Sequence, residues 1–313
     1  MSVIGPKDSP RQLMSIAAKG FCMGAADVVP GVSGGTMAFI LGIYQRLLDA
    51  IKAFDLATLR LITTARFSNA AQRVDLLFLL ALGLGILSAL LVFTRVIPLP
   101  VLIRTHPELI YGLFFGLIVA SVAVLVRELG QMRAGDIGAM AIGVIFGAIV
   151  INLVPTETPE NSWFVFLAAA LAICAMILPG ISGSFILLIL QKYAYIFDAI
   201  GRLDFNVIVP FALGAATGLL LFSRVLSWLL ATYYRPTLLM IIGVLVASLW
   251  KIWPFQDRIY EIVRNKERLM GSSPTLPHAL DTTTLGAIAL AVTGFIAVLL
   301  IQWLANRNSS NAA

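Results

Sequence analysis

Two similar segments, each expected to interrupt a membrane helix, constrain this chain more than any other feature. The first covers residues 26–36 and reads ADVVPGVSGGT; the second covers residues 175–185 and reads AMILPGISGSF. In each, a proline removes a backbone N–H and disfavours the helical state of the residue before it. The glycines that follow tolerate conformations that other residues avoid. We therefore predict helix breaks at Pro30 and Pro179, at equivalent places in the chain.

The composition is typical of a membrane protein. Of the 313 residues, 59% are hydrophobic and 12% are charged, and the mean hydropathy is +0.95. Soluble domains are far more polar, and several apolar runs here approach the length of about 20 residues that crosses a bilayer. The formal net charge of +6 is typical of basic cytoplasmic loops and gives no reason to expect a nucleic-acid partner. We predict an all-α polytopic membrane protein.

The similarity between the two segments extends into an internal repeat. At an offset of 149 residues, identities continue without a gap to Ile51 and Ile200. At an offset of 129, Phe93–Val96 then aligns with Phe222–Val225. Each half of the chain is therefore expected to contain one broken segment followed by three membrane spans.

This repeat predicts the organisation of the whole chain. We expect a cytoplasmic N-terminal tail at 1–11; a first repeat at 12–154, with a re-entrant hairpin at 12–53 and spans at 75–97, 107–127 and 135–154; a second repeat at 161–305, with a re-entrant hairpin at 161–200 and spans at 207–232, 236–252 and 284–305; and a C-terminal tail at 306–313.

The relative direction of the repeats depends on how each broken segment meets the membrane. A re-entrant hairpin leaves three crossings per repeat and inverts the second one, whereas a kinked crossing gives four and keeps the repeats parallel. Basic residues favour the cytoplasm and flank the first broken segment on both sides, which favours re-entry and two inverted repeats. These residues are Lys7, Arg11, Lys19, Lys52, Arg60, Arg66 and Arg73. The segment 253–283 is an exception, because this arrangement places its basic residues outside.

The breaks favour an anion-binding site. A helix that begins after a break has free N–H groups and partial positive charge at its first turn, which attract anions. Small residues also allow close helix packing, but packing alone does not require two breaks at matched places. The residues expected to line the site are small or carry a hydroxyl: Gly31, Ser33, Gly34, Gly35, Thr36, Gly180, Ser182, Gly183 and Ser184.

Four other polar residues stand out. Arg95 and Arg224 occupy equivalent repeat positions near the ends of spans, where they either bind an anion or extend to the membrane surface. Asp27 directly precedes the first break, and we weigh coupling to an ion equally with capping of backbone N–H groups. We interpret Tyr44 as an interface anchor, in preference to a polar contact inside the protein.

The run from Lys19 to Thr36, followed by Gly42, Ile43 and Tyr44, resembles the signature of the PopT-type polyprenyl-phosphate transporter family of bacteria. The second motif, residues 178–184, is similar to that of the family's second half. The resemblance covers about residues 12 to 305. It implies a flippase of the bacterial cytoplasmic (inner) membrane that returns undecaprenyl phosphate from the outer to the inner leaflet for envelope glycan synthesis.

The resemblance and the residues together define the expected function. The nine break residues and the two arginines would bind the lipid phosphate, with the lipid bilayer as surroundings and a proton or sodium ion as coupling partner at Asp27. A secondary transporter for a small soluble anion is the alternative. We do not expect an enzyme, a cofactor or a metal site, because the sequence has no phosphate loop for ATP and no cluster with metal-ligand spacing.

Overall fold

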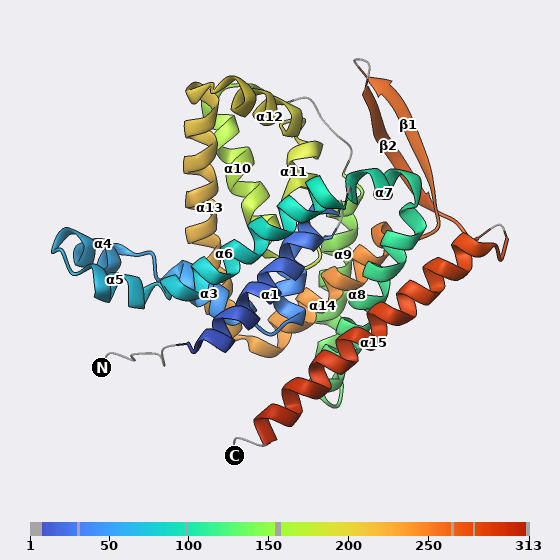
Figure 1. The fold of residues 1–313 in the computed structure, drawn as a ribbon, viewed down its shortest axis with the longest axis horizontal. Helices are drawn as coiled ribbons and strands as arrows, with labels where there is room; N and C mark the ends of the chain where they lie inside the picture. Colours follow the sequence, from blue (N-terminus) through green and yellow to red (C-terminus); the bar gives the residue numbers. More distant parts are fainter. Residues whose placement is uncertain are drawn as a thin grey trace. The chain divides into compact units, whose positions relative to one another are not determined.

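The computed structural model describes residues 8–29, 32–97, 99–153, 158–263, 266–277 and 279–310. These residues are helical apart from turns and one two-stranded β-hairpin (Figure 1). The chain divides into two compact units, each assembled from both halves of the sequence. Unit 1 comprises Met1–Ile97 and Asn152–Leu238, and unit 2 comprises Pro98–Ile151 and Leu239–Ala313.

Unit 1 contains both broken segments. Its helices are α1 (Pro10–Val28), α2 (Gly34–Ile40), α3 (Tyr44–Lys52), α4 (Leu56–Thr63), α5 (Phe67–Arg73), α6 (Leu76–Leu91), the π-helix η1 (Val92–Val96), α10 (Ser162–Ile177), α11 (Gly183–Ile189), α12 (Tyr193–Arg202) and α13 (Phe205–Thr232).

Unit 2 contains the remaining long helices and the hairpin. Its elements are α7 (Leu99–Thr105), α8 (Pro107–Leu129), α9 (Ala134–Ile151), most of α14 (Tyr234–Ile252), β1 (Gln256–Val263), β2 (Lys266–Pro274) and α15 (Thr282–Ser310). The strands pair antiparallel within the segment 253–283, which the inverted arrangement left as an exception.

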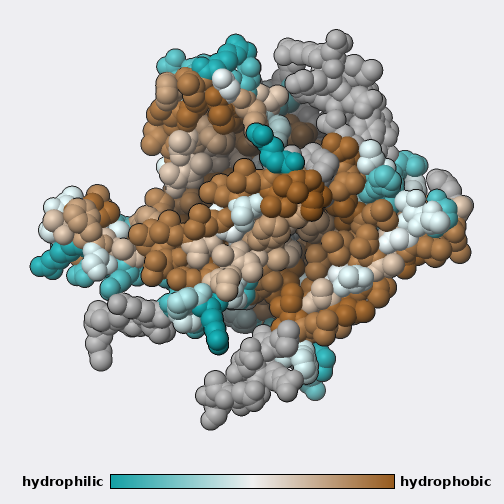
Figure 2. Space-filling view, viewed as in Figure 1, coloured by the Kyte–Doolittle hydropathy of each residue, from teal (hydrophilic) through white to brown (hydrophobic). Residues whose placement is uncertain are grey.

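Several helices are long and apolar enough to cross a membrane. Within the described residues these are α8, α9, α13, α14 and α15, five in all, or up to seven spans if two bent helix pairs each count as one. Large apolar side chains are exposed on their outer faces, as hydrocarbon surroundings allow. Figure 2 shows hydrophobic residues along α6, α13 and α15, and hydrophilic residues near α12 and at the tip of α4 and α5. The chain is a helical multi-pass membrane protein, as predicted.

Glycines bring helices of unit 1 together in the same way in both repeats. Gly85 of α6 packs on the backbone of Ala17 in α1, and Gly214 of α13 packs on the backbone of Phe166 in α10. Residues 85 and 214 differ by 129, and residues 17 and 166 differ by 149, so these contacts follow the two sequence offsets. The repeat read from the sequence is therefore a repeat of tertiary contacts.

The same contacts give the direction of each helix pair in unit 1. An added Cβ on Gly24 would lie 2.7 Å from the Ile86 oxygen, and Gly20, one turn earlier, meets the Leu82 oxygen, also one turn earlier. The helices α1 and α6 therefore run parallel. Gly214 and Gly218 meet Phe166 and Ala170 in the same order, so α10 and α13 are parallel too.

Unit 2 has two further parallel pairs. Gly112 and Gly116 of α8 approach the carbonyl oxygens of Ala287 and Ala291 in α15. A second close approach joins α9 to α14: Gly143 meets the Met240 oxygen, and an added Cβ on Gly147 would lie 2.7 Å from the Cβ of Ala247. In both pairs the residue numbers rise together, so α8 runs parallel to α15 and α9 runs parallel to α14.

We predict that Gly112→Ala destabilises the protein, because the added methyl group would lie 2.5 Å from the backbone oxygen of Ala287. The two helices must separate to admit it, at a cost of about 1–3 kcal/mol. Thermal unfolding in detergent measures the effect. Gly138→Ala in α9 is the control, since nothing lies within 4 Å of its added Cβ. Equal melting temperatures for the two variants would contradict this account of the packing.

Candidate functional site

The two broken segments have the same local structure. The helices that follow the breaks, α2 and α11, start at Gly34 and Gly183 and have equal lengths, so the offset of 149 holds in the structure. Two positions after the end of each helix lies a residue with positive φ, Gly42 at +69° or Gln191 at +52°, before α3 or α12 begins. The predicted break at Pro179 follows the end of α10 at Ile177. Pro30 and Gly31 lie outside the described residues.

Within unit 1 the two breaks contact each other through hydrogen bonds. The Ser33 hydroxyl donates to the Met176 carbonyl oxygen over 3.2 Å, and the Tyr44 hydroxyl donates to that of Ile177 over 2.9 Å. In the reverse direction, the backbone N–H of Gly180 donates to the Thr36 hydroxyl over 2.8 Å. Carbonyls at the end of a helix lack intrahelical partners. Side chains of the first break therefore satisfy the backbone of the second.

Gly35 allows this close approach. An added Cβ would lie 2.8 Å from the carbonyl oxygens of both Met176 and Ile177. No side chain fits there unless the segments separate. The second repeat has Ser184 at the equivalent position, and this residue is exposed. A glycine is therefore needed in the first break, where the backbones touch, but not at the equivalent position of the second.

Residues of the chain itself occupy the N-terminus of α2. The Gly34 N–H donates to a carboxylate oxygen of Asp27 over 2.7 Å, and the Gly35 N–H donates to the Ser33 hydroxyl over 3.1 Å. The Cβ of any larger residue at Gly34 would lie 2.5 Å from the other Asp27 oxygen. Of the two interpretations of Asp27, capping is the one for which a hydrogen bond is present.

The second break is more open. Met176 stands where the first repeat has Asp27, and the side chain of Ser182, the residue that precedes α11, makes no capping hydrogen bond. The Ser182 and Ser184 hydroxyls instead lie 2.8 Å apart, with Ser182 half-buried and Ser184 exposed. Hydroxyl donors are therefore accessible at the second break, whereas the first break is closed by its own side chains.

Three polar residues of this region were missed or misinterpreted. Tyr44 is not an interface anchor: it is 4% exposed and bonded across the breaks, whereas the equivalent Tyr193 is 40% exposed. Lys19 donates to the Leu41 carbonyl over 2.9 Å, and the Thr158 hydroxyl donates to the equivalent carbonyl of Leu190. Lys19 lies in the run that carries the family resemblance, which was the available signal for it.

The two predicted arginines lie apart from these contacts. Arg224 of α13 donates to the Leu220 carbonyl over 2.9 Å and to the Phe54 carbonyl over 3.1 Å, and it lines a cavity of about 400 Å³. Arg95 lies exposed in η1. Within the described ranges, no hydrogen bond joins either arginine to a break. The structure brings Ser33, Gly35 and Thr36 of the first break into contact with the second break, but not the arginines.

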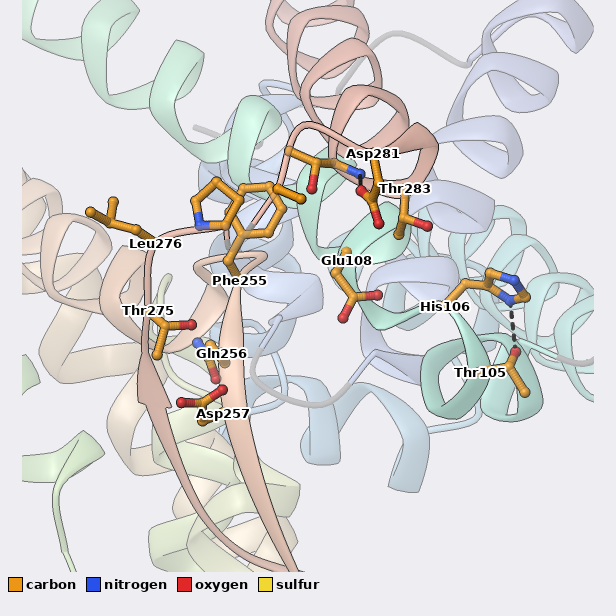
Figure 3. A pocket seen from close by; sticks show the side chains of 13 residues that line it. Thr105, His106, Glu108, Phe255, Gln256, Asp257, Thr275, Leu276, Asp281 and Thr283 are labelled. Carbon is orange, nitrogen blue, oxygen red and sulfur yellow. Dashed lines mark hydrogen bonds between the residues drawn. The ribbon is translucent and has the colours of Figure 1, made fainter.

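A second cavity, of about 470 Å³, lies in unit 2 at the base of the β-hairpin (Figure 3). Its lining includes Glu108, Asp257 and Asp281, together with His106, whose ring nitrogen lies 3.0 Å from the Thr105 hydroxyl. None of the predicted site residues lines it. In the part of the chain that the structure describes, no group of three or more His, Cys, Asp or Glu side chains is arranged to hold a metal ion.

We predict that Tyr44→Phe destabilises unit 1, because it leaves the Ile177 carbonyl without its donor in a buried site. The expected loss is about 1–3 kcal/mol. Tyr193→Phe provides a matched control at the equivalent repeat position, where the ring is exposed. Thermal unfolding of both variants in detergent gives the comparison, and a Tyr44→Phe protein as stable as Tyr193→Phe would argue against the bond across the breaks.

Comparisons with known proteins identify relatives along most of the chain. Residues 23–270 match the family described as VCA0040-like, undecaprenyl phosphate translocase-like. A protein of Vibrio cholerae serotype O1 named polyprenyl-phosphate transporter is 39% identical over 246 residues, which cover 79% of each chain. One of Staphylococcus aureus with the same name is 29% identical over 256 residues, covering 75% of this chain and 84% of its own. No solved structure matches the chain significantly.

Proposed function

The chain belongs to the undecaprenyl phosphate translocase-like family, and on that premise we propose that it carries polyprenyl phosphate across the bacterial cytoplasmic membrane. The direction that we propose is from the outer to the inner leaflet, which returns undecaprenyl phosphate to envelope glycan synthesis. The observation that carries the proposal is the contact between two broken helices within one unit. Broken helices that meet near the membrane midplane form the binding sites of many transporters.

Two inverted repeats with re-entrant hairpins are the second part of the proposal, and the helix directions in unit 1 support it. If α1 enters from the cytoplasm and the chain returns there through α2 and α3, α6 must leave from the same face and run parallel to α1. A kinked crossing would make these helices antiparallel. The parallel contacts of α1 with α6, and of α10 with α13, favour re-entry in both repeats.

Helix directions in unit 2 support the inversion independently. The short loop between α8 and α9 makes these neighbours in sequence run in opposite directions between the two membrane faces. Since α14 runs parallel to α9, it runs opposite to α8, which is its counterpart in the first repeat. Parallel repeats would give α8 and α14 the same direction. In the inverted arrangement the two hairpins enter the membrane from opposite faces.

The proposed phosphate site combines the breaks with the two arginines. The residues are Gly31, Ser33, Gly34, Gly35, Thr36, Gly180, Ser182, Gly183, Ser184, Arg95 and Arg224. The accessible hydroxyls of Ser182 and Ser184 support a larger role for the second break, because Asp27 and Ser33 already satisfy donors of the first. In the inverted arrangement, Arg95 lies toward the outer face and Arg224 toward the inner face, so each leaflet has one arginine.

We expect the Arg95→Gln/Arg224→Gln double variant to equilibrate polyprenyl phosphate at least about tenfold more slowly than the wild type, since each loss removes charge-assisted hydrogen bonds. Proteoliposomes would contain labelled polyprenyl phosphate, and a membrane-impermeant phosphatase would report the outward-facing fraction over time. Arg202→Gln is the control, because its exposed guanidinium pairs with Asp198 and touches neither break.

Each outcome of this assay discriminates between functions. Equilibration that survives in the double variant would keep lipid transport but remove the arginines from the site. No protein-dependent equilibration, with or without a proton or sodium gradient, would favour transport of a small soluble anion. Phosphate release by the protein alone would indicate an enzyme.

Asp27 is the proposed coupling group, and two substitutions separate coupling from capping. Asn can still accept the hydrogen bond from Gly34 but cannot ionise, whereas Ala loses both functions. We expect Asp27→Asn to fold and to transport without dependence on pH or sodium. Asp27→Ala should lose about 0.5–2 kcal/mol of stability, as removal of a helix cap does. Transport by Asp27→Asn that keeps its full pH and sodium dependence would refute the coupling role.

A further inference from the structure

A groove in unit 1 places the guanidinium group of Arg224 beside a wall of apolar side chains. It has a volume of about 400 Å³ and lies between Arg224 of α13 and the residues that lead into and form α4. The wall consists of Phe54, Leu56, Leu59 and Ile62. Phe54, Leu59 and Ile62 remain 45%, 54% and 46% exposed. Large apolar side chains left open beside a cation fit a ligand that is itself amphiphilic.

Among the residues that the structure describes, no acidic side chain forms an ion pair with Arg224. Its two hydrogen bonds go to the carbonyls of Leu220 and Phe54, which fix the side chain but carry no net charge. A guanidinium has five N–H donors, so several are left for a ligand. Asp55 is the acid in the lining of the groove, and its carboxylate is paired with Arg73 over 2.7 Å. The groove therefore retains a net positive charge.

The apolar wall belongs to one repeat only. The offset between the repeats falls from 149 to 129 after Ile51, so the first repeat has 20 more residues there than the second. Helices α4 and α5 occupy this insertion. Arg224 consequently has an apolar partner surface, whereas Arg95, its repeat counterpart, has no inserted helices supplied by the second repeat. The insertion makes the two arginine sites chemically different.

We propose that this groove is the cytoplasmic end of the polyprenyl phosphate path, with the phosphate monoester on Arg224 and the first isoprene units against Leu59 and Ile62. The proposal rests on the proposed function for the identity of the lipid and for the cytoplasmic placement. A soluble phosphate would use the guanidinium but leave the wall exposed. A neutral polyprenol would use the wall but leave the cation unpaired. The lipid phosphate satisfies both surfaces and would pause here before it enters the inner leaflet.

Photo-crosslinking tests the site without relying on transport. The purified protein in nanodiscs would receive a farnesyl phosphate probe with a diazirine in its first isoprene unit, and mass spectrometry would locate the crosslinks. We expect crosslinks on the peptide that contains Leu59 and Ile62, reduced about tenfold in Arg224→Gln through loss of charge-assisted hydrogen bonds. Arg60→Gln is the control, because this arginine is exposed on α4 and does not line the groove.

A second variant guards against indirect effects, since Arg224→Gln also removes a bond to the Phe54 carbonyl. Ile62→Asn leaves both Arg224 bonds intact and changes an exposed side chain, and it should also lower crosslinking. Unchanged crosslinking in both variants would overturn the proposal. Equal displacement of the probe by phosphatidylglycerol or by inorganic phosphate would overturn it as well, because the groove would then select neither the monoester nor the chain.

Transport by the same proteins separates the two proposals. Crosslinks at the groove in a wild-type protein that fails to equilibrate polyprenyl phosphate would refute the transport function and keep the site. Normal equilibration without crosslinks at α4 would keep the function and refute the site.

Discussion

The structure of unit 1 depends on backbone carbonyls that a broken helix leaves without partners. In hydrocarbon no water satisfies such groups, and each unpaired one costs several kcal/mol. Met176 and Ile177 at the end of α10 receive their hydrogen bonds from Ser33 and Tyr44, across 143 and 133 residues of sequence. The second break therefore depends on the first for these hydrogen bonds.

Close approach of backbones makes these bonds possible, and glycine provides it. Gly35 lets the first break contact the carbonyls of α10, while Gly85 and Gly214 bring the parallel helices of each repeat together. Packing of this kind replaces the hydrophobic effect, which does not drive helices together in lipid. These glycines therefore serve as sites of close backbone packing, not as flexible points in the chain.

The two repeats share a backbone plan but differ in chemistry. Asp27 closes the start of α2, whereas Met176 leaves the start of α11 to the accessible hydroxyls of Ser182 and Ser184. The insertion that forms α4 and α5 adds an apolar wall beside Arg224 alone. A symmetric pair of sites would treat the two leaflets alike. These differences give the proposed carrier a way to hold its lipid differently at the two membrane faces.

The sequence by itself determined the membrane class, the helical character of the chain and the duplicated segment, because hydropathy, proline and glycine act through local physics. Duplication also singled out Ser33, Thr36 and Gly35, which lie at the contact between the two breaks. Tertiary structure alone decided that Tyr44 is buried across the breaks and that Arg224 lies against α4. Those outcomes depend on which distant backbone groups need a partner, and hydrogen bonds across more than a hundred residues leave no periodic signal in a single sequence.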